Sequence, residues 1–198
     1  MTSEALGAYL NLMADILRRS DVIDAIASKQ TGLVYRITTW ESIYLQFRKI
    51  LEHIAFASLV ANKTAYAEAY DDYSRHWNAK RLLGKLAKIN PLFYPQPKTR
   101  ISGKGHVWED WIDRTDDFLT KEDFVTLYNM CGNIIHTKNP YGAALNLSAY
   151  ETGFAVWRTK IISLLNTHVI QLSGDPKLYM ILMKTEAGSV TYVEWVQA

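Results

Sequence analysis

The sequence predicts a mainly α-helical bundle that ends in an antiparallel β-hairpin. Hydrophobic residues recur with helical spacing over most of the chain, whereas residues 178–184 and 190–197 are rich in β-forming residues and are separated by a turn signal. A chain of 198 residues with 48% hydrophobic content is long enough to bury a core in one domain. We expect residues 1–168 to form the bundle, with residues 169–198 packed on it as an appendage of two or three short strands.

Two helices are expected in the first third of the chain. Ser3 is placed to cap the first, and the second is the clearest in the sequence, over residues 39–62. Thr38 and Glu41 have the spacing of a capping box, and apolar residues follow them along one stripe. Because apolar residues also project from the opposite side, we expect this second helix to lie at the centre of the bundle.

The middle of the chain alternates between helix signals and turn residues. Thr64 is placed to cap a further helical pattern, which Pro91 stops. Residues 90–106 contain three prolines and two glycines, so we expect a long loop there. A short acidic helix or turn over residues 108–117 is expected to follow.

Two more helices are expected before the hairpin. Thr120, with Asp123 three residues later, begins the first of them, which carries the most informative segment of the chain. Ser148 and Glu151 again have capping-box spacing, and they introduce a helix of about 20 residues.

The charges are unevenly distributed. Residues 75–108 carry eight lysines and arginines with no acidic residue, and residues 109–123 are mainly acidic. One interpretation is that the two blocks pair with each other or with a partner subunit as solvated ion pairs. The other is that the basic block attracts a polyanion such as RNA, with interleaved aromatic residues as stacking surfaces for unpaired bases. The residues concerned in the second interpretation are Lys98, Arg100, Lys104, Trp77, Phe93, Tyr94 and Trp108.

Several classes of protein are disfavoured by composition. The single cysteine, Cys131, excludes an internal disulfide and a multi-cysteine metal site, and it fits a reducing compartment. No signal-peptide pattern and no apolar run long enough for a membrane span occurs, so we expect a soluble, cytoplasmic protein without membrane contact. The histidines lack the helical spacing of a metal pair, so we expect neither a metal nor another cofactor.

The segment from residue 128 to residue 140 is the candidate site. On a helix begun at Thr120, the side chains of Asn129, Asn133 and His136 share one polar stripe, with Gly132 beside it and Cys131 on the core face. Imidazole exchanges protons near neutral pH, and neighbouring amides can hold an anionic oxygen. The alternative is structural: the polar groups satisfy carbonyls at the helix end, and the glycine admits a packed helix.

A second polar group of residues lies on the predicted central helix. Arg48 and Glu52 form an i,i+4 pair of opposite charge, which is the simplest interpretation. His53 lies about 140° from Arg48 around an ideal helix. These two side chains could therefore contact one phosphate only if both are extended toward it, or if a partner's surface brings the phosphate to both.

Taken together, these features resemble the HEPN superfamily, whose active members are metal-independent ribonucleases. The family hallmark is an arginine and a histidine separated by four to six residues, on a late helix of the bundle. Arg48 and His53 satisfy this spacing on an early helix, whereas Asn129 and His136 occupy the late position with asparagine in place of arginine. The similarity covers residues 39–140 at most.

The resemblance implies roles for these residues. His136 would act as general base or acid on the ribose hydroxyl, with Asn129 and Asn133 holding the phosphate. The missing cation would come from elsewhere. The residues expected to bind substrate are Lys138, Asn139, Arg48, His53, Lys98, Arg100 and Lys104.

Two functional hypotheses follow. The first is a HEPN-like homodimer that binds or cleaves RNA as a metal-independent endoribonuclease, in a bacterial stress, toxin–antitoxin or antiviral defence system. The second is a non-catalytic protein-interaction or regulatory module, either antitoxin-like or a subunit of a complex, in which the polar stripe and the charged blocks form a protein interface.

Overall fold

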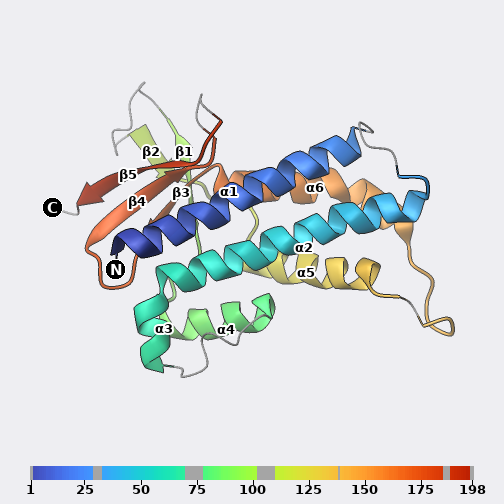
Figure 1. Ribbon diagram of the computed structural model, residues 1–198, viewed down its shortest axis with the longest axis horizontal. Helices are drawn as coiled ribbons and strands as arrows, with labels where there is room; N and C mark the ends of the chain where they lie inside the picture. Colours follow the sequence, from blue (N-terminus) through green and yellow to red (C-terminus); the bar gives the residue numbers. More distant parts are fainter. Residues whose placement is uncertain are drawn as a thin grey trace.

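The computed structural model describes residues 2–28, 33–69, 78–101, 110–137, 139–184 and 188–196. Within these ranges the chain forms six helices and a five-stranded sheet (Figure 1). The mainly helical prediction is therefore confirmed in outline. The helices are α1 (Thr2–Ala27), α2 (Arg36–Ala61), α3 (Lys63–Ala69), α4 (Ala79–Ile89), α5 (Lys121–Ile135) and α6 (Leu147–Leu165).

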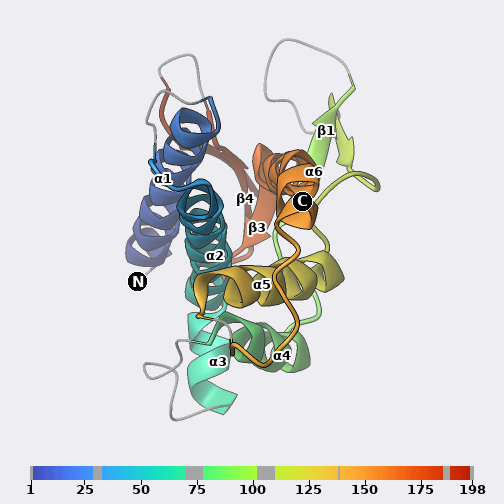
Figure 2. The same cartoon turned by 90° about the vertical axis from the view of Figure 1, so that its right-hand side faces the viewer.

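Helix α2 is the centre of the bundle, as its two-sided apolar pattern predicts. It contacts each of the other five helices. Figures 1 and 2 show α1 and α2 lying side by side, with α5 against α2. Side chains on one stripe of α2 are almost completely buried, because their helical spacing places them all on the face that meets these neighbours. They include Ile43, Phe47, Ile50, Leu51 and Ile54.

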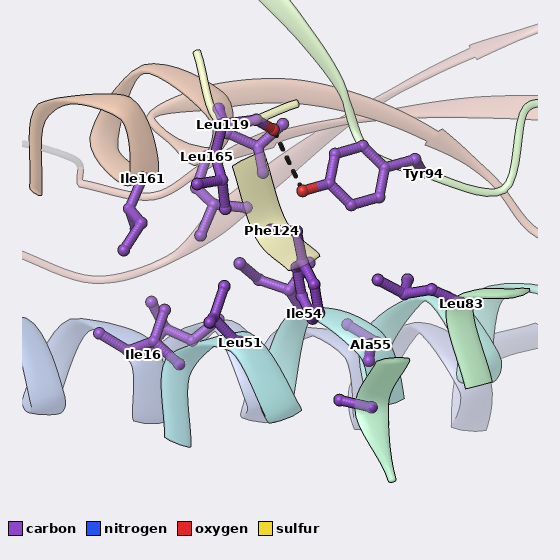
Figure 3. Close-up of a cluster of buried hydrophobic side chains, with 14 of the residues drawn as sticks. Ile16, Leu51, Ile54, Ala55, Leu83, Tyr94, Leu119, Phe124, Ile161 and Leu165 are labelled. Atoms are coloured by element: carbon purple, nitrogen blue, oxygen red, sulfur yellow. Dashed lines mark hydrogen bonds between the residues drawn. The ribbon is translucent and has the colours of Figure 1, made fainter. Parts of the chain in front are cut away.

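The core continues from α2 to α5, α6 and the segments around them (Figure 3). Leu51 and Ile54 of α2 lie below Phe124 of α5 in this view. Above them, the Tyr94 hydroxyl donates to the Leu119 carbonyl at 3.1 Å, which satisfies two polar groups inside the core. Tyr94 is a core residue here and offers no stacking surface.

The predicted helix starts differ in their outcome. At α5, Thr120 accepts from the Asp123 N–H and the Asp123 carboxylate accepts from the Thr120 N–H, so this capping box is confirmed. At α2 the capping-box prediction is wrong, because the helix begins at Arg36, earlier than Thr38. The Thr38 hydroxyl instead donates to the Tyr35 carbonyl inside the first turn.

The capping box predicted for α6 is also wrong. The Asn146 side chain caps this helix by accepting from the Ala149 N–H at 3.3 Å, two residues before the expected Ser148. Helix α3 begins at Lys63, so Thr64 lies inside its first turn. The stop at Asn90 and Pro91 is confirmed by the end of α4 at Ile89.

The sheet is larger than the predicted hairpin. The hairpin itself is confirmed as β4 with β5, and β3 is the expected third strand. All neighbouring strands are antiparallel, in the order β2-β1-β3-β4-β5. The strands are β1 (Gln96–Arg100), β2 (Trp111–Asp113), β3 (Thr167–Gln171), β4 (Lys177–Leu182) and β5 (Thr191–Val196).

Strands β1 and β2 correct the predictions for residues 90–106 and 108–117, which were a long loop and a short acidic helix or turn. Pro97 is tolerated in β1 because it acts as an acceptor: its carbonyl receives the Arg114 N–H at 2.9 Å. Long-range pairing with β3 outweighs the local turn preference of the prolines. The sheet therefore combines strands from both sides of the expected boundary at residue 168.

Candidate functional site

An open pocket of about 590 Å³ lies where α5 faces α2, at the C-terminal end of α5. The structure brings the three predicted catalytic residues together here, and it adds two of the predicted substrate-binding residues, Arg48 and Asn139. The lining residues are Arg48, Tyr128, Asn129, Gly132, Asn133, His136, Thr137 and Asn139.

Helix α5 supplies most of the pocket through its amphipathic pattern. Phe124, Leu127 and Cys131 are buried completely on the core face, whereas Asn129 and Asn133 are exposed on the other side. The helix ends at Ile135, so His136 is its C-cap in an extended conformation and does not lie on the helical stripe itself. The His136 N–H donates to the Gly132 carbonyl at 3.3 Å, which keeps the residue beside the pocket.

Arg48 reaches the pocket from α2. Its guanidinium carbon lies 4.0 Å from the centre of the Tyr128 ring, and its Nη2 donates to the Tyr128 hydroxyl at 2.7 Å. Its Nε donates to Glu52 at 3.3 Å. Because its side chain is only 21% exposed, these contacts are partly shielded from water.

Gly132 makes room for this arginine. A β-carbon at residue 132 would lie 3.3 Å from Arg48 Nη1, closer than side-chain carbons ordinarily approach. The sequence predicted a close approach at this glycine without indicating what approaches. The structure shows that it is the guanidinium group.

The charges around Arg48 do not cancel. Glu52 accepts from Arg48 through Oε1 and from Lys49 Nζ through Oε2 at 2.8 Å, so one carboxylate faces two cations. This edge of α2 therefore carries an excess positive charge beside the pocket.

His53 turns away from the pocket toward α1. Its Nε2 lies 2.8 Å from Asp15 and its Nδ1 lies 2.6 Å from the Lys49 carbonyl oxygen. Burial opposes the charge of Asp15, but Arg19, His53 and Arg18 outweigh burial and lower the pKa of this carboxyl. His53 thus serves the contact between α1 and α2.

The predicted basic contacts at Lys98 and Arg100 lie on β1 and do not line the pocket. Lys98 forms an ion pair with Asp113 of β2 at 2.5 Å and is only 9% exposed, which agrees with the ion-pair interpretation of the charged blocks. The guanidinium carbon of Arg100 lies 5.6 Å from the Trp111 ring centre. Predicted residues that fall outside the described ranges are Lys104, Lys138, Trp77 and Trp108.

Neither the cysteine nor the buried histidine is suited to chemistry at the pocket. Burial raises the pKa of the Cys131 thiol to about 12, which keeps it protonated. His168 is completely buried between the Tyr9 hydroxyl and the Leu165 carbonyl. Phe93 is also buried, so it offers no stacking surface. Among the described residues, no group of three or more metal-ligating side chains occurs.

Sequence reasoning missed Tyr128, because its position on the helical wheel placed it with the core. Tyr128 is indeed only 5% exposed, yet it lines the pocket, and its hydroxyl accepts a hydrogen bond from Arg48. The residue type could have indicated this role, because a tyrosine at the margin of an apolar stripe can bury its ring and present its hydroxyl to a site.

No family model, curated protein or solved structure matches this chain. In the part of the chain that the structure describes, no helix is long and apolar enough to cross a membrane. An arginine, an imidazole and two amides around one open hollow are suited to binding an oxyanion and moving a proton beside it.

Proposed function

We propose that this protein binds single-stranded RNA in the pocket between α2 and α5 and cleaves it without a metal ion, in the manner of the HEPN-like ribonucleases that the sequence resembles. One observation carries the proposal. Arg48 enters the pocket that His136, Asn129 and Asn133 line, and it is the cation that the late helix lacks in its own sequence.

The proposed reaction uses the ribose as its own nucleophile. His136 accepts the proton of the 2′-hydroxyl, and the 2′-oxygen attacks the adjacent phosphorus while the bond from phosphorus to the 5′-oxygen breaks. The products are a 2′,3′-cyclic phosphate and a 5′-hydroxyl, whose proton is supplied by solvent. Arg48 and the amides of Asn129 and Asn133 hold the phosphate and offset its developing charge.

An exposed aromatic residue beside the pocket favours RNA with unpaired bases. Tyr141 is 96% exposed, two residues after Asn139, which lines the pocket. The Tyr141 N–H donates to the Asn139 side chain at 3.0 Å, and the Gly142 N–H donates to the Asn139 carbonyl at 2.9 Å. This tight turn keeps the backbone of Tyr141 next to the pocket-lining Asn139, and an unpaired base can stack on the exposed ring.

The test is cleavage of single-stranded RNA by purified protein in the presence of a chelator. We expect His136→Ala to abolish cleavage with little change in melting temperature, because His136 is exposed. His53→Gln is the matched control: this histidine lies outside the pocket, so cleavage should persist. Failure of the wild-type protein to cleave any member of a broad RNA panel would exclude the catalytic part of the proposal.

A non-catalytic interaction module is the second candidate. Leu33, Val34 and Tyr35, which precede α2, are three consecutive exposed apolar residues, a feature more typical of protein contacts than of free surface. Neither RNA binding nor RNA cleavage by the purified protein would favour this class, whereas retained RNA binding without cleavage would leave the pocket as a binding site only.

A further inference from the structure

The Tyr128 hydroxyl can donate one hydrogen bond in addition to those it accepts. Its oxygen accepts the hydrogen bond from Arg48 Nη2 at 2.7 Å, which occupies a lone pair and leaves the O–H as a donor. Among the described residues, no acceptor for this proton is found. The side chain is 95% buried and lines the pocket, so the pocket is where this donor can find a partner.

Arg48 is in a similar position. Nε is directed at Glu52 and Nη2 at Tyr128, and these two contacts fix the plane of the guanidinium group. Nη1 then lies in the slot beside Gly132, in the wall of the pocket. Its N–H groups are the part of the guanidinium that remains for a ligand.

The two donors are held in place before any ligand arrives. The Tyr128 ring stacks against Phe124 with centres 6.1 Å apart and planes at 11°, and it packs beneath the Arg48 guanidinium at 4.0 Å. Neither side chain has to lose much conformational freedom when an anion binds.

We propose that Tyr128 O–H and Arg48 Nη1 together form a two-donor site for one phosphate group, and that Tyr128 is a ligand-binding residue in addition to positioning the arginine. The excess positive charge of Arg48 and Lys49 over Glu52 favours an anion at this place. The assignment of this phosphate to RNA rests on the proposed function. The existence of the phosphate site does not depend on that function.

The test measures the affinity of the protein for inorganic phosphate by calorimetry or by NMR titration. Tyr128→Phe keeps the ring, its stacking and its contact with the guanidinium, and it removes only the hydroxyl. We expect phosphate to bind about tenfold more weakly, as for loss of one hydrogen bond to a charged group. Tyr150→Phe is the matched control, because the Tyr150 hydroxyl donates to the carbonyl of Met130, which lies on α5 like Tyr128. This substitution should leave the affinity for phosphate unchanged.

A second variant approaches the site from the other donor. Arg48→Lys retains the charge but loses the two Nη groups, and we expect a similar loss of phosphate affinity. Unchanged phosphate affinity in Tyr128→Phe, or equal losses in Tyr128→Phe and Tyr150→Phe, would overturn the inference.

The outcome separates this inference from the proposed function. Phosphate binding that depends on Tyr128, without RNA cleavage, supports the two-donor site and removes the ribonuclease. RNA cleavage by a protein whose phosphate affinity is indifferent to Tyr128→Phe keeps the ribonuclease and removes the two-donor site.

Discussion

In the pocket, Arg48 and His136 face an open hollow, whereas in the sheet Lys98 and His168 are enclosed by partners from the protein itself. Lys98 is paired with Asp113 at 9% exposure, and His168 lies between the Tyr9 hydroxyl and the Leu165 carbonyl at 0% exposure. Each region thus contains one cation and one histidine, and those of the sheet are the more enclosed.

The difference shows that residue type alone does not indicate a site. A polar side chain is available to a ligand only if folding leaves it both accessible and with unused hydrogen bonds. In the sheet those bonds are spent on structure. In the pocket, the exposed face of α5 and the slot at Gly132 leave them for a ligand.

The largest expected effect separates the two cations. Arg48→Ala should weaken binding of single-stranded RNA by about 100-fold or more, because a partly shielded charge that pairs with a phosphate contributes ~3 kcal/mol. Fluorescence anisotropy with a labelled oligonucleotide measures this directly. A loss below about fivefold would show that the pocket does not bind the phosphate.

The second prediction concerns the buried histidine. Burial lowers the pKa of His168 to about 4, from 6.5 in the unfolded chain, so the folded protein holds it neutral. The neutral His168 makes its full contribution to the free energy of unfolding above pH 6.5. As the pH falls toward 4, the free energy of unfolding decreases by ~3 kcal/mol. Urea unfolding at several pH values should show this decline in wild type and in His136→Ala, but a shallower one in His168→Gln.

The third prediction tests the slot for the guanidinium. Gly132→Ala places a methyl group 3.3 Å from Arg48 Nη1 and should weaken RNA binding by about tenfold, with the free energy of unfolding changed by less than about 1 kcal/mol. Gly84→Ala in α4 is the control, because a β-carbon there meets no atom within 4 Å. Undiminished RNA binding by the Gly132 variant would mean that the guanidinium need not occupy this position.

The smallest expected effect is at the sheet. Lys98→Gln should change RNA affinity by less than about twofold, because Lys98 is already paired with Asp113 and lies outside the pocket. The same anisotropy assay measures it. A loss as large as that of Arg48→Ala would instead support the interpretation of the basic block as a polyanion surface.

Much of the helical architecture could be predicted from local patterns. The stripe of α2 and the capping box at Thr120 are encoded by residues a few positions apart, so they are readable in the sequence. The caps at Thr38 and Ser148 were mispredicted because several neighbouring residues can cap a helix, and packing selects among them. Strand β1 was missed because its pairing with β3 joins residues about 70 positions apart.

The sequence by itself determined that Asn129, Asn133 and His136 would lie close together near the end of one helix, and that Cys131 would be buried. Helical periodicity fixes the positions of Asn129, Cys131 and Asn133, and His136 stays beside them because it directly follows the helix end. Only the tertiary structure decided which cation joins them, because Arg48 lies 88 positions before His136 along the chain and reaches the pocket through the packing of α2 on α5. The same packing buries most of Tyr128 but keeps it in the lining of the pocket, where its hydroxyl contacts Arg48.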